Sequence, residues 1–283
     1  MIYLITVNYY STELIANLLR SIQLEQPASY KLIIVNNSPD DALLPTLEMP
    51  STFIIEAQEN LGYGRACNIA LNWVYAHDPQ AIVWLINPDA HLVGQSIEQA
   101  QAFFHQHPEV SISGTAVYDS AGKVWFGGGI FLPLLGAILS KNLLSKYSKK
   151  DYFVSEWVTG CSLLINLKHF SECPFFDPDY FLYYEDFDFC QRYAHQNHLV
   201  AVNPKITVIH QVSSTTQRNI SAKIRHSTYS YLITLEKHAS SPVLLIRLLG
   251  IIGHSIIRLP IKPKVSIGAF RGIWFYLKRA IQP

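Results

Sequence analysis

The sequence predicts an α/β fold, in which a mostly parallel β-sheet is flanked by helices on both faces. Over residues 1–110, short apolar runs of strand length alternate with segments whose apolar residues recur at helical spacing. Polar clusters directly follow two of these runs, and ligands bind at the carboxyl ends of parallel strands. The chain has 283 residues, 49% hydrophobic and 15% charged, which suffices for one large or two small domains with a substantial core.

Four apolar runs predict strands in the first part of the chain, over residues 2–7, 31–35, 53–56 and 81–86. Helical spacing of apolar side chains predicts helices over residues 14–22, from about residue 65 to 73, and over residues 96–106. The polar clusters Asn36-Asn37-Ser38 and Asn87-Pro88-Asp89 end the second and fourth runs. We therefore expect both clusters at the same edge of the sheet.

The alternation becomes irregular after residue 110. A loose apolar segment follows Gly127, and the stretch EDFDFCQRYAHQ predicts a helix from Glu185, with Phe189 and Tyr193 one turn apart. Further strands are predicted over residues 110–118, 123–126, 157–165 (interrupted by Gly160), 199–202 and 206–209.

The ends and cysteines of the chain favour a cytoplasmic protein. The N-terminal stretch MIYLITVNYY has no basic leader and no small-residue cleavage site, so it is typical of a first strand and not of a signal peptide. No run reaches the ~18 uncharged apolar residues of a membrane-spanning helix. The four cysteines are scattered without a CxxC pair, which favours reduced thiols.

The C-terminal segment combines basic and apolar residues. Residues 242–283 contain seven Lys and Arg and no Asp or Glu, which leaves 15 basic and 21 acidic residues, a net charge of −6, for residues 1–241. Two basic amphipathic helices are expected, over residues 243–259 and 269–281. Such helices suit an anionic bilayer surface. The alternatives are helices packed on the rest of the chain or on a second copy in a homodimer.

Three carboxylates interrupt an aromatic run in YFLYYEDFDFC, residues 180–190. Carboxylates resist burial unless they are paired, hydrogen-bonded or metal-bound, whereas aromatic residues bury large areas. The structural explanation is a helix start, because acids there complement the helix dipole. A functional explanation comes from Asp89 and His210, which end predicted strands. A carboxylate and an imidazole can hold Mg²⁺ or Mn²⁺, and a further acid can serve as a general base.

With these motifs in order, the chain resembles glycosyltransferase family 2, and within it the rhamnosyltransferase-like branch of bacterial O-antigen and related lipopolysaccharide biosynthesis. The resemblance covers about residues 2–215. It is carried by TVNY (6–9), VNNS (35–38), NLGYGRACNIA (60–70), WLINPDAHL (84–92), WVTGCSLLI (157–165), FLYYEDFDFCQR (181–192) and VIH (208–210). The family has the GT-A fold, uses a nucleotide-diphosphate sugar and usually a divalent cation, and inverts the anomeric centre.

The resemblance implies a metal site for Mg²⁺ or Mn²⁺. Asp89 matches the last acid of the family's DxD-type metal motif, here reduced to Asn87-Pro88-Asp89. His210 matches a histidine that completes the metal site in some relatives. A cation at this place would offset charge on the departing diphosphate.

The resemblance also assigns the three acids. Asp186 matches the catalytic base, which takes the proton of the acceptor hydroxyl in a single displacement. We expect its aromatic surroundings to raise its pKa by desolvation and to form a wall for sugar stacking. Glu185 is expected to contact the acceptor or orient Asp186, and Asp188 to pair with Arg192. The implied acceptor-binding residues are Trp157, Gly160, Tyr184 and Glu185.

The implied donor-nucleotide residues are Thr6, Asn8, Tyr9, Asn36, Gly62, Arg65, Asn87 and Asp89. The family usually has Asp at the position of Asn36, where it accepts a hydrogen bond from N3–H of uracil or thymine. Asparagine keeps a carbonyl acceptor and adds an NH₂ donor, so pyrimidine binding is expected with weaker charge assistance. Gly62 and Gly64 would let the backbone approach the donor closely, and Arg65 could reach a phosphate.

The resemblance implies an inverting, metal-dependent transfer of L-rhamnose from dTDP-L-rhamnose to a lipid-linked or growing polysaccharide. It implies a GT-A catalytic domain over residues 1–215, with a nucleotide-binding half to about residue 110 and an acceptor-binding half after it. A helical, membrane-associated region over residues 216–283 would place the protein at the cytoplasmic face of a bacterial plasma membrane.

Alternatives remain at this point. A UDP-galactofuranose or other UDP-hexose donor fits the same fold, and Asn36 is a hint of a non-catalytic membrane-associated scaffold. A sugar-phosphate nucleotidyltransferase would need a Gly-rich, basic signature after the first strand, where this chain has NYYSTEL. No nucleic-acid partner is expected, because the basic residues concentrate in an apolar tail without a recognisable nucleic-acid motif.

Overall fold

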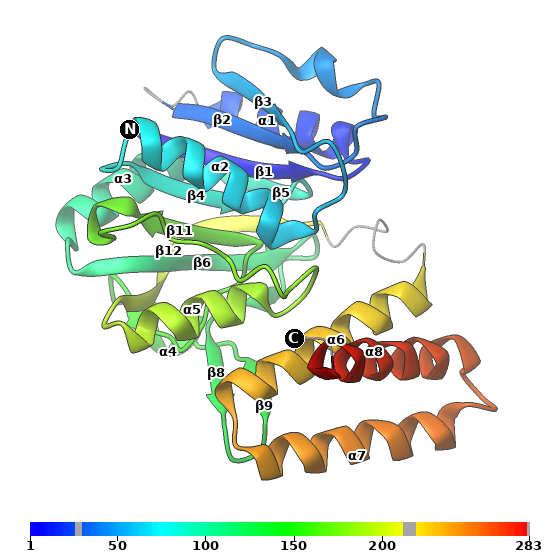
Figure 1. The fold of residues 1–283 in the computed structure, drawn as a ribbon. Coiled ribbons are helices and arrows are strands. Elements are labelled where there is room, and N and C mark those ends of the chain that lie inside the picture. Colours follow the sequence, from blue (N-terminus) through cyan, green and yellow to red (C-terminus); the bar gives the residue numbers. More distant parts are fainter. Residues whose placement is uncertain (26–29, 212–218, 282–283) are drawn as a thin grey trace.

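The computed structural model describes residues 1–25, 30–211 and 219–281. They form a large mixed β-sheet with helices on both faces, and a helical C-terminal part that lies beside it (Figure 1). The predicted α/β fold with a mostly parallel sheet is confirmed.

The first long strands pair in parallel, in the order β4-β1-β2-β3, with β3 at the edge of the sheet. The residues of β1 are all buried, which explains why this strand appears in the sequence as an apolar run without alternation. The bounds of these strands are β1 (Ile2–Asn8), β2 (Tyr30–Asn36), β3 (Thr52–Glu56) and β4 (Ile82–Ile86).

Two apolar cores lie on the two faces of the sheet. The side chains of β1 alternate between them, as strand geometry requires. Tyr3 and Ile5 belong to the core that includes residues of α2 and α5, whereas Ile2 and Leu4 belong to the core of α1 and α3. The helices are α1 (Thr12–Glu25), α2 (Tyr63–His77), α3 (Ser96–Gln106) and α5 (Glu185–His195).

The other half of the sheet is mixed, in the order β10-β12-β6-β11, with β11 next to β4. β11 is antiparallel to both β4 and β6, and β12 is parallel to β6. Strands β1, β2, β3, β4, β6 and β12 therefore all end at the edge where β11 begins. The strands of this half are β5 (Ala90–Val93), β6 (Val110–Asp119), β7 (Val124–Phe126), β10 (Phe153–Val154), β11 (Ser162–Asn166) and β12 (Leu199–His210).

Some predicted elements were wrong in extent. The strand expected over residues 157–165 begins only at Ser162, and the preceding residues form a loop. The strands expected over 199–202 and 206–209 are one strand, β12, whose pairing with β6 is irregular between Asn203 and Thr207. Pro204, which lacks a backbone N–H, lies in this interval and gives the physical reason.

The loose segment after Gly127 contains a hairpin that was not predicted. Its strands are β8 (Gly129–Leu132) and β9 (Ala137–Ser140), which form a small separate sheet, and Gly129 also makes an isolated antiparallel bridge with Trp157. Short helical turns occur after this hairpin at α4 (Leu144–Tyr147), between β2 and β3 at Leu44–Leu47, and after β11 at Leu167–His169.

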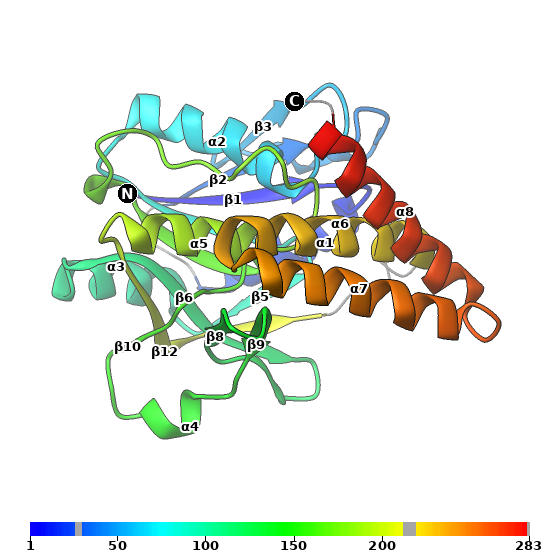
Figure 2. The ribbon, with the colours of Figure 1, turned by 60° about the horizontal axis from the view of Figure 1, so that its bottom comes forward.

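Three helices form the C-terminal part: α6 (Ile220–His238), α7 (Ser241–Arg258) and α8 (Pro263–Ile281). Figure 2 shows them as a layer next to α5. α8 packs closely on α6, because a Cβ on Gly272 would lie 2.6 Å from the carbonyl oxygen of Arg225. Ile273 and Tyr276 of α8 are buried with Leu232 of α6. Two of these helices match those expected in the tail, and α6 lies within the region 216–283 that was expected to be helical, although its bounds were not predicted.

The C-terminal part is joined to α5 through Asp188, whose side chain is fully buried. It accepts hydrogen bonds from Arg192 Nε at 2.7 Å and from His238 Nε2 of α6 at 2.8 Å. These contacts hold the pKa of Asp188 below its usual value despite the opposing effect of burial. The pairing with Arg192 was predicted and is confirmed.

The predicted domain boundary at residue 215 lies outside the described residues, within 212–218. Among the described helices, α7 alone is long and apolar enough to cross a membrane, and its residues are mostly exposed.

Candidate active site

The strand ends bring most of the predicted site residues to one edge of the sheet. Asn8 ends β1, Asn36 ends β2 and His210 ends β12, while Asp89 follows β4. The loop before β11 reaches the same edge, where Cys161 O accepts a hydrogen bond from Asn87 N at 3.0 Å. Segments more than 50 residues apart in sequence thus meet here.

Asp89 and His210 form the centre of the candidate metal site. Asp89 Oδ1 lies 3.1 Å from His210 Nε2, and both residues are buried. Pairing between β5 and β12 sets His210 opposite Ala90, and Gln211 N donates to Asp89 O at 2.9 Å. The side chains predicted to meet from two distant motifs do meet.

The donor set fits a hard divalent cation. Neighbouring ligands at about 2.1 Å around an octahedral ion are separated by roughly 3 Å, which matches the distance from Asp89 Oδ1 to His210 Nε2. The described residues hold no group of three or more His, Cys, Asp and Glu suited to a metal ion. The two side chains would therefore be part of a shell that water and substrate phosphate complete.

Asp186 is held by the backbone at the start of α5. Its Oδ2 accepts a hydrogen bond from Gly160 N at 2.8 Å, and its Oδ1 accepts one from Phe187 N at 2.8 Å. Burial raises the pKa of Asp186, and these hydrogen bonds oppose the shift. The partly buried carboxylate is therefore oriented and more basic than an exposed one, as a general base requires.

Glu185 is buried beside Asp186. Its Oε2 has no hydrogen-bond partner among the described residues, which is unusual for a buried carboxylate oxygen. Burial and, second, the neighbouring Asp186 carboxylate raise the pKa of Glu185 to about 8. Glu185 Oε2 is thus an unsatisfied buried acceptor directly beside the candidate base.

The turn before α5 has an uncommon backbone conformation. Tyr183 and Tyr184 both have positive φ, at 72° and 66°, which is rare for bulky residues. Such strain persists where the surrounding structure imposes it, and it is frequent at functional sites.

The aromatic run is mostly core. Phe187 is 1% exposed and Phe189 is fully buried, and Tyr180 is buried among residues of α6 and α8. The sugar-stacking wall expected of this run is thereby limited to the partly buried residues Tyr183 and Tyr184, together with Phe181. Most aromatic side chains of this stretch pack in the core, whereas Asp186 beside them is only partly buried.

Trp157 and Gly160, predicted to bind the acceptor, flank the same region. The Trp157 ring lies 6.4 Å from the Phe187 ring, and its buried Nε1 has no hydrogen-bond partner among the described residues. Tyr63, which was not predicted, donates its hydroxyl hydrogen to Gly160 O at 2.8 Å.

Asn36 does not present its carbonyl as expected. Its Oδ1 accepts hydrogen bonds from Asn8 Nδ2 and Ser38 N, each at 3.2 Å, and its Nδ2 donates to Glu56 Oε2 at 2.8 Å. The acceptor that was expected to read the base is therefore occupied within the protein. Glu56 at the end of β3 was missed, because its role depends on pairing between strands.

The other residues predicted to bind the donor nucleotide differ in their exposure and in their contacts within the protein. Thr6 is fully buried, whereas Tyr9 is 47% exposed at the end of β1. Arg65 donates from Nε and Nη2 to Pro178 O, at 2.9 and 2.6 Å, so its side chain is engaged by the protein. A Cβ on Gly62 would lie 2.1 Å from Phe181 O, and this glycine has φ of 81°. The absence of a side chain at Gly62 thus lets its backbone lie close to the backbone of Phe181.

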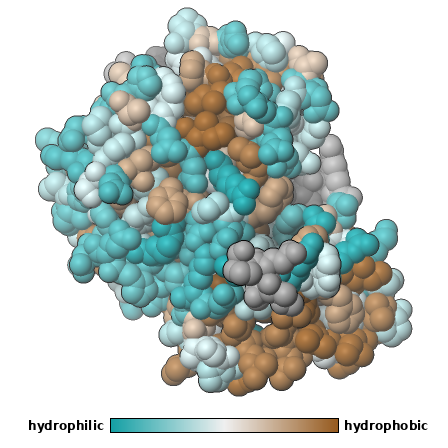
Figure 3. All heavy atoms as spheres, in the orientation of Figure 1, coloured by the Kyte–Doolittle hydropathy of each residue, from teal (hydrophilic) through white to brown (hydrophobic). Residues whose placement is uncertain are grey.

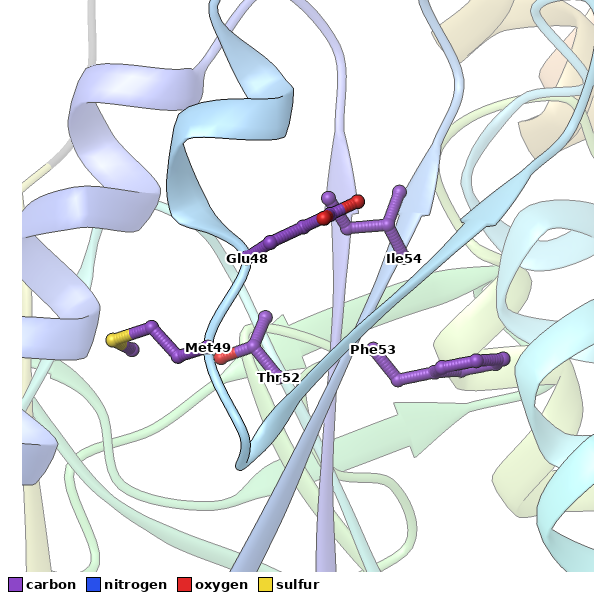
Figure 4. Close-up of a pocket in the computed structure, with 5 residues that line it drawn as sticks. All are labelled: Glu48, Met49, Thr52, Phe53 and Ile54. Carbon is purple, nitrogen blue, oxygen red and sulfur yellow. The ribbon is translucent and has the colours of Figure 1, made fainter.

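A surface hollow lies away from these residues (Figure 4). It has a volume of about 480 Å³ and is lined by Glu48, Met49, Thr52, Phe53 and Ile54. These residues belong to the start of β3 and the turn before it, at the opposite end of the strand from Glu56. The hollow includes none of the candidate site residues.

No family model matches the chain. In sequence, the chain is 25% identical over 242 residues to N-acetylglucosaminyl-diphospho-decaprenol L-rhamnosyltransferase of Mycobacterium tuberculosis, in strains CDC 1551 and H37Rv. The match covers 77% of this chain and 78% of that protein.

Solved structures share the fold at low sequence identity. GalNAc-T7 with UDP, GalNAc and Mn²⁺ has a TM-score of 0.62 and 13% identity, over 83% of this chain but only 47% of that one. A mannosyltransferase from Pyrobaculum calidifontis with GDP-Man and Mn²⁺ has a TM-score of 0.57 and 13% identity, over 98% and 86%. Residues 1–349 of S. aureus TarS have a TM-score of 0.55 and 14% identity, over 82% and 64%.

The fold and the relatives define a glycosyltransferase of the GT-A class. Within that class, the resemblance to the rhamnosyltransferase-like branch of family 2 is confirmed by the similarity to the mycobacterial enzyme.

The raised pKa of Glu185 predicts how stability depends on pH. The folded state keeps this proton up to about pH 8, whereas an ordinary glutamate loses it near 4.5, so the free energy of unfolding should fall as pH rises between these values. Glu185→Gln should reduce this decline. Urea denaturation at several pH values measures it, with exposed Glu59→Gln as the control. If the free energy of unfolding falls equally with pH in the wild type and in Glu185→Gln, the raised pKa of Glu185 would be contradicted.

Proposed function

We propose that this protein transfers L-rhamnose from dTDP-L-rhamnose, with inversion, to a lipid-linked saccharide in the synthesis of a bacterial surface polysaccharide of the O-antigen type. The observation that carries the proposal is that one loop connects the oriented carboxylate of Asp186 to the segment of the Asp89–His210 pair. Asp186 accepts a hydrogen bond from Gly160 N. Cys161, which follows Gly160, accepts one from the N–H of Asn87, two residues before Asp89. The donor sugar follows the mycobacterial relative, whose name includes L-rhamnosyltransferase.

In the proposed reaction, the acceptor hydroxyl gives its proton to the Asp186 carboxylate as its oxygen bonds to the anomeric carbon. The bond from this carbon to the diphosphate oxygen breaks, and the diphosphate leaves with the electron pair. Attack opposite the leaving group converts a β-linked donor into an α-L-rhamnoside. Asp89 and His210 would hold Mg²⁺ or Mn²⁺, which supplies positive charge to the leaving diphosphate when bound. Glu185, whose Oε2 has no partner among the described residues, would contact the acceptor.

The proposed acceptor brings the protein to a membrane, and the C-terminal part offers a surface for it. One side of α7 exposes apolar side chains, and Figure 3 shows apolar residues gathered over the lower part of the molecule, where Figure 1 places this helix. We define this α7 strip by Leu245, Ile246, Leu249, Ile256 and Ile257, which are 55–74% exposed.

The tip of the β8–β9 hairpin extends the α7 strip. Leu134 and Leu135 are 85% and 58% exposed, and Arg247 of α7 donates from Nε to Leu135 O at 2.7 Å. The hairpin also packs against α6, where Tyr231 donates its hydroxyl hydrogen to Gly136 O at 2.7 Å. Because residues 242–283 contain no acid, we propose that this surface lies on the anionic cytoplasmic face of the plasma membrane.

Replacing the candidate base tests the reaction. Asp186→Asn keeps the size of the side chain but removes the proton acceptor, so rhamnosyl transfer should fall by at least about 100-fold. Binding of dTDP with Mn²⁺, measured by calorimetry, should stay within a factor of about two of the wild type. Transfer at the wild-type rate would exclude Asp186 as the base. Wild-type preference for UDP over dTDP would replace the donor while retaining the enzyme class.

Mn²⁺ binding tests the proposed metal site separately from the reaction. Asp89→Asn should weaken Mn²⁺ binding in the presence of dTDP at least tenfold, because a neutral amide replaces the charged ligand. Electron paramagnetic resonance of free Mn²⁺ during a titration measures this directly. Asp151→Asn, at an aspartate whose side chain is 56% exposed on another part of the surface, is the matched control. Identical Mn²⁺ titrations for Asp89→Asn and the wild type would contradict the site.

Acidic residues on the α7 strip should prevent membrane binding. We expect the full-length Ile246→Glu/Ile257→Glu protein to lose co-sedimentation with phosphatidylglycerol vesicles, because burial of charge in the bilayer interface is unfavourable. It should bind dTDP as the wild type does. Leu43→Glu/Val154→Glu changes residues that are 58% and 66% exposed elsewhere and is the matched control. Sedimentation of both double variants at the wild-type level would contradict the membrane assignment.

A further inference from the structure

The ends of β1, β2 and β3 place three polar side chains in one row. Asn8 pairs with Asn36 in the register of β1 and β2, and Asn36 pairs with Glu56 in the register of β2 and β3. Hydrogen bonds run along the row, from Asn8 Nδ2 to Asn36 Oδ1 at 3.2 Å and from Asn36 Nδ2 to Glu56 Oε2 at 2.8 Å. Asn8 is fixed in turn by donation from Ser11 N to its Oδ1 at 2.9 Å.

The neighbours of Asn36 allow one orientation of its amide. Two donors, Asn8 Nδ2 and Ser38 N, face its oxygen, and a carboxylate faces its nitrogen. In the flipped amide, the NH₂ group would face those donors and the carbonyl would face the Glu56 carboxylate, which would remove all three hydrogen bonds. Asn36 is also only 3% exposed. It therefore offers no free carbonyl to a nucleobase, and its amide serves to hold Glu56.

Glu56 is the exposed end of the row. Among the described residues, Asn36 alone donates a hydrogen bond to its carboxylate, so Oε1 and further lone pairs are available. The carboxylate lies at the carboxyl edge of the sheet, in the strand next to the one where the family usually has its base-reading acid. The acid absent at position 36 thus has a counterpart one strand away.

We propose that Glu56 binds the nucleobase of the donor, with its carboxylate accepting a ring N–H, and that Asn36 is its positioning residue. This inference rests on the proposed function as a nucleotide-sugar transferase. The ligand class is a nucleoside diphosphate whose base carries a ring N–H at the recognition edge, which uracil, thymine and guanine do. Cytosine has an unprotonated N3 there, and its lone pair would be repelled by the carboxylate.

Calorimetric titration of the full-length protein with dTDP and dCDP, with Mn²⁺ present, tests the proposal. In Glu56→Gln, the side-chain carbonyl can still accept from Asn36, which turns the NH₂ group toward the base. The Kd for dTDP should rise at least tenfold, as expected for loss of a charge-assisted hydrogen bond. The preference for dTDP over dCDP should fall by at least the same factor. Glu59→Gln removes the same charge from an exposed residue nearby and should change neither value.

A charge swap distinguishes base recognition by Glu56 from base recognition at position 36. Asn36→Asp/Glu56→Gln keeps one hydrogen bond between the two side chains with the donor reversed, and it moves the carboxylate to position 36. Because position 36 is buried and its oxygen accepts from Asn8 and Ser38, this double variant should not regain the dTDP affinity and selectivity lost in Glu56→Gln. Recovery in the double variant would place base recognition at position 36 and overturn the role of Glu56.

The outcomes separate the two proposals. Tight dTDP binding by the wild type that is unchanged in Glu56→Gln would overturn the role of Glu56 and leave the proposed function intact. Equal loss of dTDP and dCDP binding in Glu56→Gln, or recovery of dTDP binding in the charge swap, would also overturn it. Failure of the wild type to bind any of dTDP, UDP and GDP would overturn both proposals.

Discussion

A hydrogen bond from the backbone N–H of Gly160 to Asp186 Oδ2 joins helix α5 to the sheet edge on which the candidate active site is built. The carbonyl of the same residue accepts from Tyr63 of α2, so one glycine connects two helices and the loop before β11. A Cβ on Gly160 would lie 3.4 Å from Asp186 Cβ and 3.3 Å from the Tyr63 ring, closer than most side chains approach. The place of the candidate base relative to Asp89 depends on this contact together with two others between the same loop and α5, from Val158 N to Cys190 Sγ at 3.4 Å and from Gln191 Nε2 to Glu156 O at 2.7 Å.

Three acids that are almost adjacent in sequence have different electrostatic environments. Asp188 points toward α6 and accepts hydrogen bonds from Arg192 and His238, which hold its pKa below the usual value despite burial. No cation of the described residues pairs with Glu185 or Asp186, and burial raises the pKa of both. The helical rotation of about 100° per residue separates these environments within one turn. One acid thus supports the fold, while the pKa values of the other two are raised.

Two hydrogen bonds from α6 connect the C-terminal helices to the segment before α5. Ser230 of α6 donates to Leu182 O at 2.8 Å, and Thr234 donates to the Tyr180 hydroxyl at 3.2 Å. The uncommon backbone of Tyr183 and Tyr184 is therefore held by a helix that packs against α7 and α8. If α7 lies on a membrane as proposed, the surface that meets the lipid and the turn that carries Asp186 belong to one packed unit.

The sequence by itself determined the strands and helices of the first half and the residue types at the strand ends. Burial on both faces leaves long apolar runs, and helices need apolar residues at regular spacing, so both are local patterns. It also indicated that Asp89 and His210 would meet, since parallel strands end at one edge. The tertiary structure alone decided which atoms are available: Pro178 occupies Arg65, and the β2–β3 register turns the Asn36 amide toward Glu56. Such assignments depend on partners distant in the chain, and local propensity carries no information about them.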